Sequence, residues 1–328
     1  MGLGSFFKKI LNNEDQVARG RTVNSPVKSP VTDEPDGDGP DLWEPFARVY
    51  MVELLFNDMP LDLHQTQIYK ALLAHFGAVD HLGEDKPATQ GNRLLQFAFP
   101  GKGTVTESGA MPFIMAMMVP DRQNKLPLEN EPHYAPSFTQ SWLFPDAKEA
   151  LENCRYSLMV NDMLASGVEY RQRLRMFMRT LYTIVDVLRP VAIHFRHSQQ
   201  FIKTERFLDN HPDNEDYDLL MGAMNVRFFK SEGEDDTFVM DTLGLVALGV
   251  PDLQMHYHGF EPSQVAGVLN GTGHYIFEHG DVIQDGHTLS GWDPEQRWVC
   301  QHEASLIEPT RLVLDINPGP PFAAGNRA

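Results

Sequence analysis

The chain has 328 residues, of which 42% are hydrophobic and 10% aromatic, a composition typical of a folded protein with a sizeable core. It holds 45 acidic and 27 basic residues, for a formal net charge of −18, and a surface of this sign repels the phosphates of nucleic acids. The acidic charge favours a basic protein partner, or serves solubility alone. Two cysteines, Cys154 and Cys300, lie far apart, which argues against a disulfide scaffold and a four-thiolate zinc site.

The first twelve residues carry the pattern of an amphipathic helix. Their apolar side chains recur at helical spacing and form one stripe, made by Leu3, Phe6, Phe7, Ile10 and Leu11. Lys8 and Lys9 lie beside this stripe. We predict a docking helix at residues 1–12 that contacts a partner protein or a membrane surface. Docking on its own chain, or a helix that forms only occasionally, is the alternative.

The segments on either side of the predicted globular region differ from it in composition. Residues 13–42 are rich in proline, glycine and charge and nearly lack large apolar groups, so burial cannot offset their ordering entropy. We predict a disordered linker there and a flexible tail at 318–328, PGPPFAAGNRA. Between them, residues 43–317 are predicted to form an α+β globular region, either as one body or as two subdomains with a boundary near residue 235.

The first two thirds of the globular region alternate between strand and helix patterns. Runs of β-branched and aromatic residues predict strands over 46–56, 94–99, 112–120, 156–160 and 191–195. Helical periodicity predicts a helix over 63–76, between Asp62 as N-cap and Gly77 as C-cap. A longer helix is predicted over 168–188, and Pro190 ends it.

The last third repeats this alternation. Strands are predicted over 237–249, 252–260 and 311–316. A turn at Pro251 joins the first two strands, a helix begins at Pro262, and Asp285-Gly286 marks a hairpin turn. This order of elements predicts an α+β fold, with mostly antiparallel or mixed sheets and with helices packed on one face.

A block of residues in the last third is distinctive. It contains Gly249, Pro251, Asp252, Leu253 and Gln254, the pairs Gly280-Asp281 and Asp285-Gly286, and Pro309 with Arg311. This block resembles an uncharacterised bacterial family catalogued as a domain of unknown function, and the resemblance is clearest over 244–316. It implies a fold and a bacterial cytosolic setting. It transfers no catalytic residue, so it implies no reaction.

Histidines supply the candidate metal site. Six of the 13 histidines follow Gln254, and two of them, His256 and His258, alternate on a predicted strand, which places both imidazoles on one face. Zinc uses such a pair, but it needs at least one further ligand that spacing alone does not supply. We therefore treat His256 and His258 as candidate metal ligands, with Asp252 or Asp281 beside them. Histidines that only form hydrogen bonds on a strand are the alternative.

Motifs for cofactors are missing from the sequence. It has no G-x-x-x-x-G-K-[ST] phosphate loop, no G-x-G-x-x-G after a strand and no G-x-S-x-G elbow, so we expect no cofactor. Trp292 lies in a Ser-Gly-Trp-Asp turn, where it either packs or touches a partner. We place Trp292 and Asp252 among the expected partner-binding residues, together with the stripe of the N-terminal helix.

Three functions remain open at this stage. The first is a non-enzymatic cytosolic protein that binds another protein, in its specific form an immunity-type inhibitor whose acidic face covers a toxin or effector. The second is a metal-dependent enzyme that uses the C-terminal histidines. The third is a peripheral protein of the inner membrane, held there by residues 3–11. The sequence leaves the oligomeric state undetermined.

Overall fold

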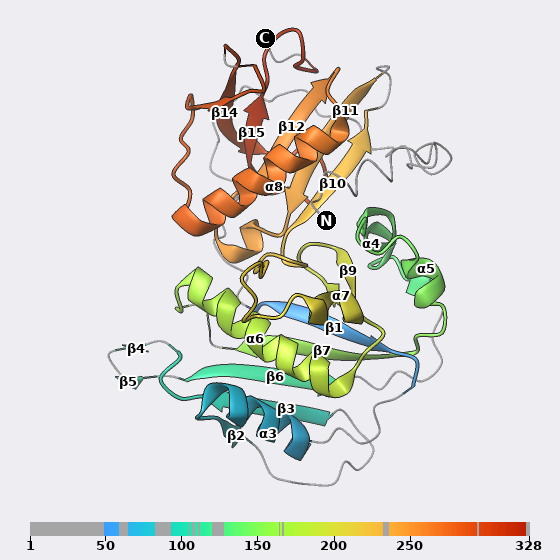
Figure 1. Ribbon diagram of the computed structural model, residues 1–328, viewed down its shortest axis with the longest axis vertical. Coiled ribbons are helices and arrows are strands. Elements are labelled where there is room, and N and C mark those ends of the chain that lie inside the picture. Colours follow the sequence, from blue (N-terminus) through green and yellow to red (C-terminus); the bar gives the residue numbers. More distant parts are fainter. Residues whose placement is uncertain are drawn as a thin grey trace, which may run out of the picture. The chain divides into compact units, whose positions relative to one another are not determined.

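The computed structural model describes residues 49–58, 65–82, 93–103, 105–106, 109–110, 112–119, 128–163, 165, 167–231, 236–293 and 295–325. The predicted docking helix at 1–12 and the predicted linker at 13–42 lie outside these ranges. The described chain divides into two compact units that adjoin in sequence at Asn225 and Val226. We call them the N-terminal unit and the C-terminal unit (Figure 1), and we describe each by itself.

The described residues of the N-terminal unit form a seven-stranded sheet in the order β2-β3-β6-β7-β1-β8-β9. Its strands are β1 (Met51–Phe56), β2 (Asp80–Leu82), β3 (Arg93–Phe99), β6 (Phe113–Val119), β7 (Tyr156–Met163), β8 (Ala192–Phe195) and β9 (Gln200–Lys203). Every neighbouring pair is antiparallel. A separate hairpin joins β4 (Val105–Thr106) and β5 (Gly109–Ala110). The interior strand β1, between β7 and β8, buries both of its faces, which explains its nearly continuous apolar run.

Two long helices of this unit, α3 (Gln65–Phe76) and α6 (Tyr170–Leu188), pack against each other over the same face of the sheet (Figure 1). The helix α6 begins where the Glu169 carboxylate accepts the Gln172 N–H at 3.0 Å, and it ends at Arg189, which has a left-handed backbone before Pro190. Shorter helices are η1 (Leu128–Asn130), α4 (Ala135–Gln140), α5 (Ala147–Ala150) and α7 (Thr204–Asp209). Both long helices were predicted from their periodicity, and the structure confirms them.

The described residues of the C-terminal unit form a six-stranded sheet in the order β10-β11-β12-β15-β14-β13. Its strands are β10 (Asn225–Lys230), β11 (Thr237–Leu243), β12 (Asp252–His258), β13 (Thr288–Ser290), β14 (Arg297–Ala304) and β15 (Leu312–Asn317). The predicted pair β11–β12 is antiparallel, whereas β12 and β15 are parallel, so the sheet is mixed. A short 3-10 helix, η2 (Val246–Leu248), precedes β12, and α8 (Pro262–His279) crosses the sheet against β11 and β12 (Figure 1).

Strand β12 gives this sheet one apolar face and one polar face. Leu253, Met255 and Tyr257 alternate along it with Asp252 and Gln254, and alternate residues of a strand point to opposite faces. The apolar face matches the buried apolar side of α8. The polar face is also buried, because Asp252 and Gln254 are inaccessible to solvent.

The chain end lies against β12 rather than apart from it. We call residues 318–325 the C-terminal strap; they fall within the segment for which composition predicted a flexible tail. Its backbone hydrogen bonds run from His258 N to Phe322 O (3.0 Å) and from Ala324 N to His256 O (3.2 Å), and together they form an antiparallel bridge between Tyr257 and Ala323. Composition misses this pairing because the pairing depends on an open edge of a distant strand.

The structure confirms the predicted α+β class. One sheet is antiparallel, the other is mixed, and helices cover a face of each. Within the described ranges, no helix is both long enough and apolar enough to cross a membrane.

Candidate functional site

An aromatic cluster in the C-terminal unit holds the predicted partner-binding residue Trp292. Its ring contacts, given as centroid distances, are Phe260–Phe322 (4.3 Å), Phe260–Trp292 (4.6 Å), Trp292–Trp298 (4.8 Å), Phe260–Trp298 (5.8 Å) and Tyr257–Phe260 (6.1 Å). Trp298 is 1% exposed, whereas Trp292 is 41% exposed. Trp292 meets both of its neighbours edge to face, an arrangement that holds the indole in place while part of its surface faces solvent.

The turn between β13 and β14 positions Trp292. A side chain on Gly291 would begin 2.8 Å from Trp298 Nε1 and 2.4 Å from Gln296 Oε1, so only glycine fits there. The Gly291 N–H donates to Gln296 O at 3.2 Å, and the Gln296 N–H donates to Asp293 O at 2.9 Å. The sequence identified this turn, but it did not show that Trp292 packs on Trp298 across the turn.

The segment of the sequence that contains Trp292 and Trp298 is rich in carboxylates. Residues 275–303 contain six aspartates and glutamates and one arginine. Two of them, Asp281 and Asp285, lie in the loop between α8 and β13 and hold His302 of β14. The contacts are His302 Nδ1 to Asp285 Oδ1 (2.7 Å), His302 N to Asp285 Oδ1 (2.7 Å) and His302 Nε2 to Asp281 Oδ1 (3.1 Å). The backbone N–H and the ring of His302 lower the pKa of Asp285, so this exposed carboxylate stays negatively charged.

Asp252, the other predicted partner-binding residue of this unit, lies in the interior. It is 0% exposed, and burial raises the pKa of its carboxyl although the Arg311 guanidinium acts in the opposite direction. The donors to its carboxylate are Arg311 Nε (3.0 Å), Thr242 Oγ1 (3.0 Å), Leu245 N (3.0 Å) and Gly244 N (3.3 Å). This corrects the expectation that Asp252 contacts a partner, because a carboxylate enclosed by four donors of its own unit has no exposed surface.

Asp252 belongs to a buried network of two arginines and two aspartates. Arg227 donates to both oxygens of Asp241, at 2.9 and 2.6 Å, and Arg311 Nη2 donates to Asp241 Oδ2 at 2.7 Å. The same arginines donate to carbonyl oxygens of a loop before β15, at Ile307, Glu308 and Pro309, each at 3.0 Å. Buried charges that are paired in this way fasten a loop to a sheet. Arg227 and Asp241 were missed, although an aspartate inside the apolar run TFVMDTLG was a signal.

The two candidate metal ligands differ in solvent exposure. His256 is buried, with Nε2 at 3.3 Å from Ser231 Oγ, whereas His258 is exposed at the end of β12. Over the ranges that the structure describes, no group of three or more His, Cys, Asp or Glu side chains is arranged to hold a metal ion. The metal hypothesis stays a prediction, and the described residues add no third ligand to it.

The N-terminal unit contains a Ser-His-Glu arrangement that the sequence did not indicate. Ser137 Oγ lies 2.8 Å from His194 Nε2, and His194 Nδ1 lies 3.1 Å from Glu53 Oε2. A catalytic triad has this order of contacts, but its serine must reach a substrate. Ser137 is 0% exposed, and burial lowers the pKa of His194. The arrangement therefore ties α4 to β8 and β1 as a structural link. Its members lie 57 and 141 residues apart, which hid it from sequence reasoning.

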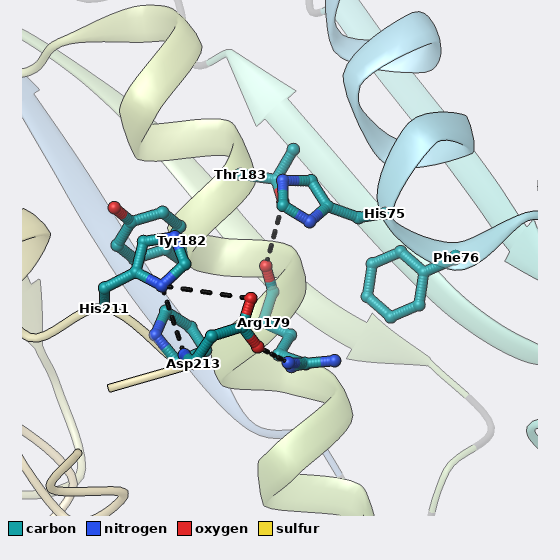
Figure 2. Close-up of a pocket in the computed structure, with 8 residues that line it drawn as sticks. His75, Phe76, Arg179, Tyr182, Thr183, His211 and Asp213 are labelled. Carbon is teal, nitrogen blue, oxygen red and sulfur yellow. Dashed lines mark hydrogen bonds and ion pairs between the residues drawn. The ribbon is translucent and has the colours of Figure 1, made fainter. Parts of the chain in front are cut away.

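A shallow hollow lies between α3, α6 and the loop after α7 (Figure 2). Its lining is His75, Phe76, Arg179, Tyr182, Thr183, His211, Pro212 and Asp213. Figure 2 shows Arg179 directed at Asp213, with which it forms an ion pair, and His211 Nδ1 accepts the Asp213 N–H at 3.1 Å. The arginine is therefore neutralised within the hollow, which leaves little charge to select an ionic ligand.

Comparison with known proteins adds a family match for the C-terminal unit. Residues 241–317 match a family described as Domain of unknown function (DUF4261). The matched span runs from β11 to β15 and includes Trp292, Asp252 and Arg311. This agrees with the resemblance to an uncharacterised family. No curated protein and no solved structure matches the chain.

Proposed function

We propose that this chain is a binding protein that contacts another protein through the part of the C-terminal unit around Trp292. The observation that carries the proposal is the state of this indole, which is 41% exposed yet fixed edge to face against Phe260 and Trp298. Tryptophans that are held in place and partly exposed dominate the binding energy of many interfaces, because little side-chain entropy is lost on contact.

The acidic charge of the chain, and of the segment that carries Trp292, supports a basic partner. The chain carries a net charge of −18, and six carboxylates against one arginine fall between residues 275 and 303. Such a surface speeds the approach of a positively charged protein and rejects acidic ones. The specific form of the proposal is an inhibitor of the immunity type in the bacterial cytosol, in which the acidic unit covers the basic face of a toxin or effector.

Affinity capture with matched variants tests this proposal. The full-length chain, Trp292→Ala and Leu94→Ala are immobilised in parallel and exposed to a lysate of the native host; Leu94 is an exposed apolar residue of the N-terminal unit. We expect a basic protein on the wild type and on Leu94→Ala, with at least a tenfold loss of affinity for Trp292→Ala when that protein is purified and titrated.

Two further measurements make the result decisive. Thermal unfolding of Trp292→Ala establishes that the variant is folded at the assay temperature. Titrations in low and high salt establish whether charge contributes, because surface electrostatics are screened as ionic strength rises. Equal binding by Trp292→Ala and the wild type contradicts the proposal.

A further inference from the structure

The C-terminal strap occupies a place that a strand of the sheet would otherwise take. One edge of β12 pairs with β11 along Gln254–His258. On its other edge, β15 pairs over Asp252–Gln254. Beyond that pairing, this second edge continues through His256–His258, and there the two backbone hydrogen bonds of the strap form its bridge to β12. The strap is thus seated on β12 as an added strand would be.

The fit between the strap and this edge is specific. The Phe322 ring stacks on Phe260 at 4.3 Å with an interplanar angle of 25°. Gly259, next to Phe260, has a φ of +70°, a backbone conformation that favours glycine, and the Phe322 ring lies within van der Waals contact of the position that a Cβ would take there. At the far end, a Cβ on Gly325 would lie 3.0 Å from His256 Cε1. An aromatic residue followed by small residues is therefore what this edge accommodates.

The strap is held more weakly than its neighbours. Two backbone hydrogen bonds, which together make up a single bridge, attach it, whereas β11 and β12 pair in register over five residues each. Segments that pair over a short stretch open at a lower cost in free energy than strands paired along their length in the core of a sheet.

We propose that this edge of β12 is a binding slot for an extended segment of a partner protein, and that the C-terminal strap is its internal occupant. The incoming segment adds as a strand antiparallel to β12 and places an aromatic side chain on Phe260, as Phe322 does. This deepens the proposed function and rests on it, because the slot shares Phe260 with the surface around Trp292.

A peptide supplied in trans tests the slot without any knowledge of the partner. The probe is a fluorescently labelled peptide of residues 317–328, NPGPPFAAGNRA, and the matched control is the same peptide with Phe322→Ala. It is titrated into the full-length wild type and into full-length Phe322→Ala. We expect saturable binding of the probe to Phe322→Ala, at least tenfold weaker binding to the wild type, where the strap competes, and at least tenfold weaker binding of the control peptide.

Hydrogen exchange of the wild type gives a second result that does not depend on a variant. We expect the amides of His258 and Ala324, which the strap pairing protects, to exchange at least a hundredfold faster than amides of β12 bonded to β11. Exchange of both sets at one rate overturns the proposal, since the strap then opens only with the whole sheet. So does a folded Phe322→Ala protein that ignores the probe or binds both peptides equally.

Two outcomes separate this proposal from related ones. If the wild type is a dimer and the Phe322→Ala variant is a monomer, the slot binds the strap of a second copy of this chain. That result overturns the assignment of the slot to a different protein. If the peptide does not bind but capture of a partner still depends on Trp292, the binding slot is contradicted and the proposed function is not.

Discussion

Arg311 shows how a charged residue can be part of a protein core. It lies 5% exposed between Asp241 and Asp252, and its remaining N–H groups donate to backbone carbonyls. Burial alone would favour the neutral form of this guanidinium, yet the two carboxylates raise the pKa of Arg311 above its ordinary value. A buried pair of this kind adds little net stability, but removal of one partner leaves an uncompensated charge in the interior.

Substitution of Arg311 tests this reasoning. We expect Arg311→Met to lower the free energy of unfolding of the C-terminal unit by about 3–5 kcal/mol, because Asp241 and Asp252 lose a shared partner. The measurement is urea denaturation followed by tryptophan fluorescence. Arg297→Met, which changes an exposed arginine on β14, is the matched control and should shift stability by no more than about 0.5 kcal/mol. Equal midpoints for the two variants would show that the network is dispensable.

His197 makes the stability of the N-terminal unit depend on pH. It stacks on Tyr50 at 5.0 Å, and burial lowers the pKa of His197 to about 4. An unfolded histidine has a pKa of about 6.5, so the unfolded chain binds this proton first as the pH falls. We therefore expect the free energy of unfolding to decrease by at most about 3 kcal/mol as the pH falls from 6.5 to 4. Above pH 7 this residue should have no effect on stability.

The His197→Gln variant isolates this contribution. Denaturation of the wild type and the variant at intervals between pH 7.5 and 4.5 gives the slope of stability against pH for each. The slope of the variant should be shallower below pH 6.5, because one proton fewer is taken up on unfolding. Parallel curves would assign the acid sensitivity to other groups.

At the scale of elements, the loop between α8 and β13 is attached to β14 through both ring nitrogens of His302. His302 Nδ1 and Nε2 lie at hydrogen-bond distance from Asp285 and Asp281, and the Gly286 N–H donates to Cys300 O at 2.8 Å. This loop precedes the turn that carries Trp292. Its attachment therefore contributes to the rigidity of the proposed binding surface.

The His302→Gln variant measures that attachment. A glutamine side chain cannot reach both carboxylates, so we expect faster hydrogen exchange at residues 280–287 and a loss of about 1 kcal/mol of stability. Exchange is followed by mass spectrometry on peptides from this loop. The control is Gln301→Ala, an exposed neighbour of His302 on β14. The same exchange rates in both variants would mean that the backbone bonds alone hold the loop.

At the scale of the molecule, two units with separate sheets and cores carry different features. The family match falls entirely in the C-terminal unit, and so do Trp292 and the strap. The N-terminal unit holds the buried Ser137–His194–Glu53 link and the hollow at Arg179 (Figure 2). The net charge of −18 belongs to the whole chain, and a surface of this sign attracts positively charged molecules and repels negatively charged ones.

Local pattern was sufficient for several elements of this protein. Helix α6 and the pair β11–β12 follow from apolar periodicity and a proline turn, because the residues that decide them are close in sequence. The α+β class followed from their order. Short elements such as β9 and α4 were missed, since four to six residues carry too little periodic signal. The predicted helix at 1–12 lies outside the described residues and stays a prediction.

The sequence by itself determined the class of fold, the long helices, several of the strands and the turn that holds Trp292, but not strands β10 and β14. Only the tertiary structure decided that Asp252 is buried, that Arg227 and Arg311 share Asp241 across 14 and 70 residues, and that the strap lies on β12. The physical reason is the range of the interactions. Periodicity acts over a few residues, whereas hydrogen bonds, ion pairs and strand edges join side chains that only the folded chain brings together.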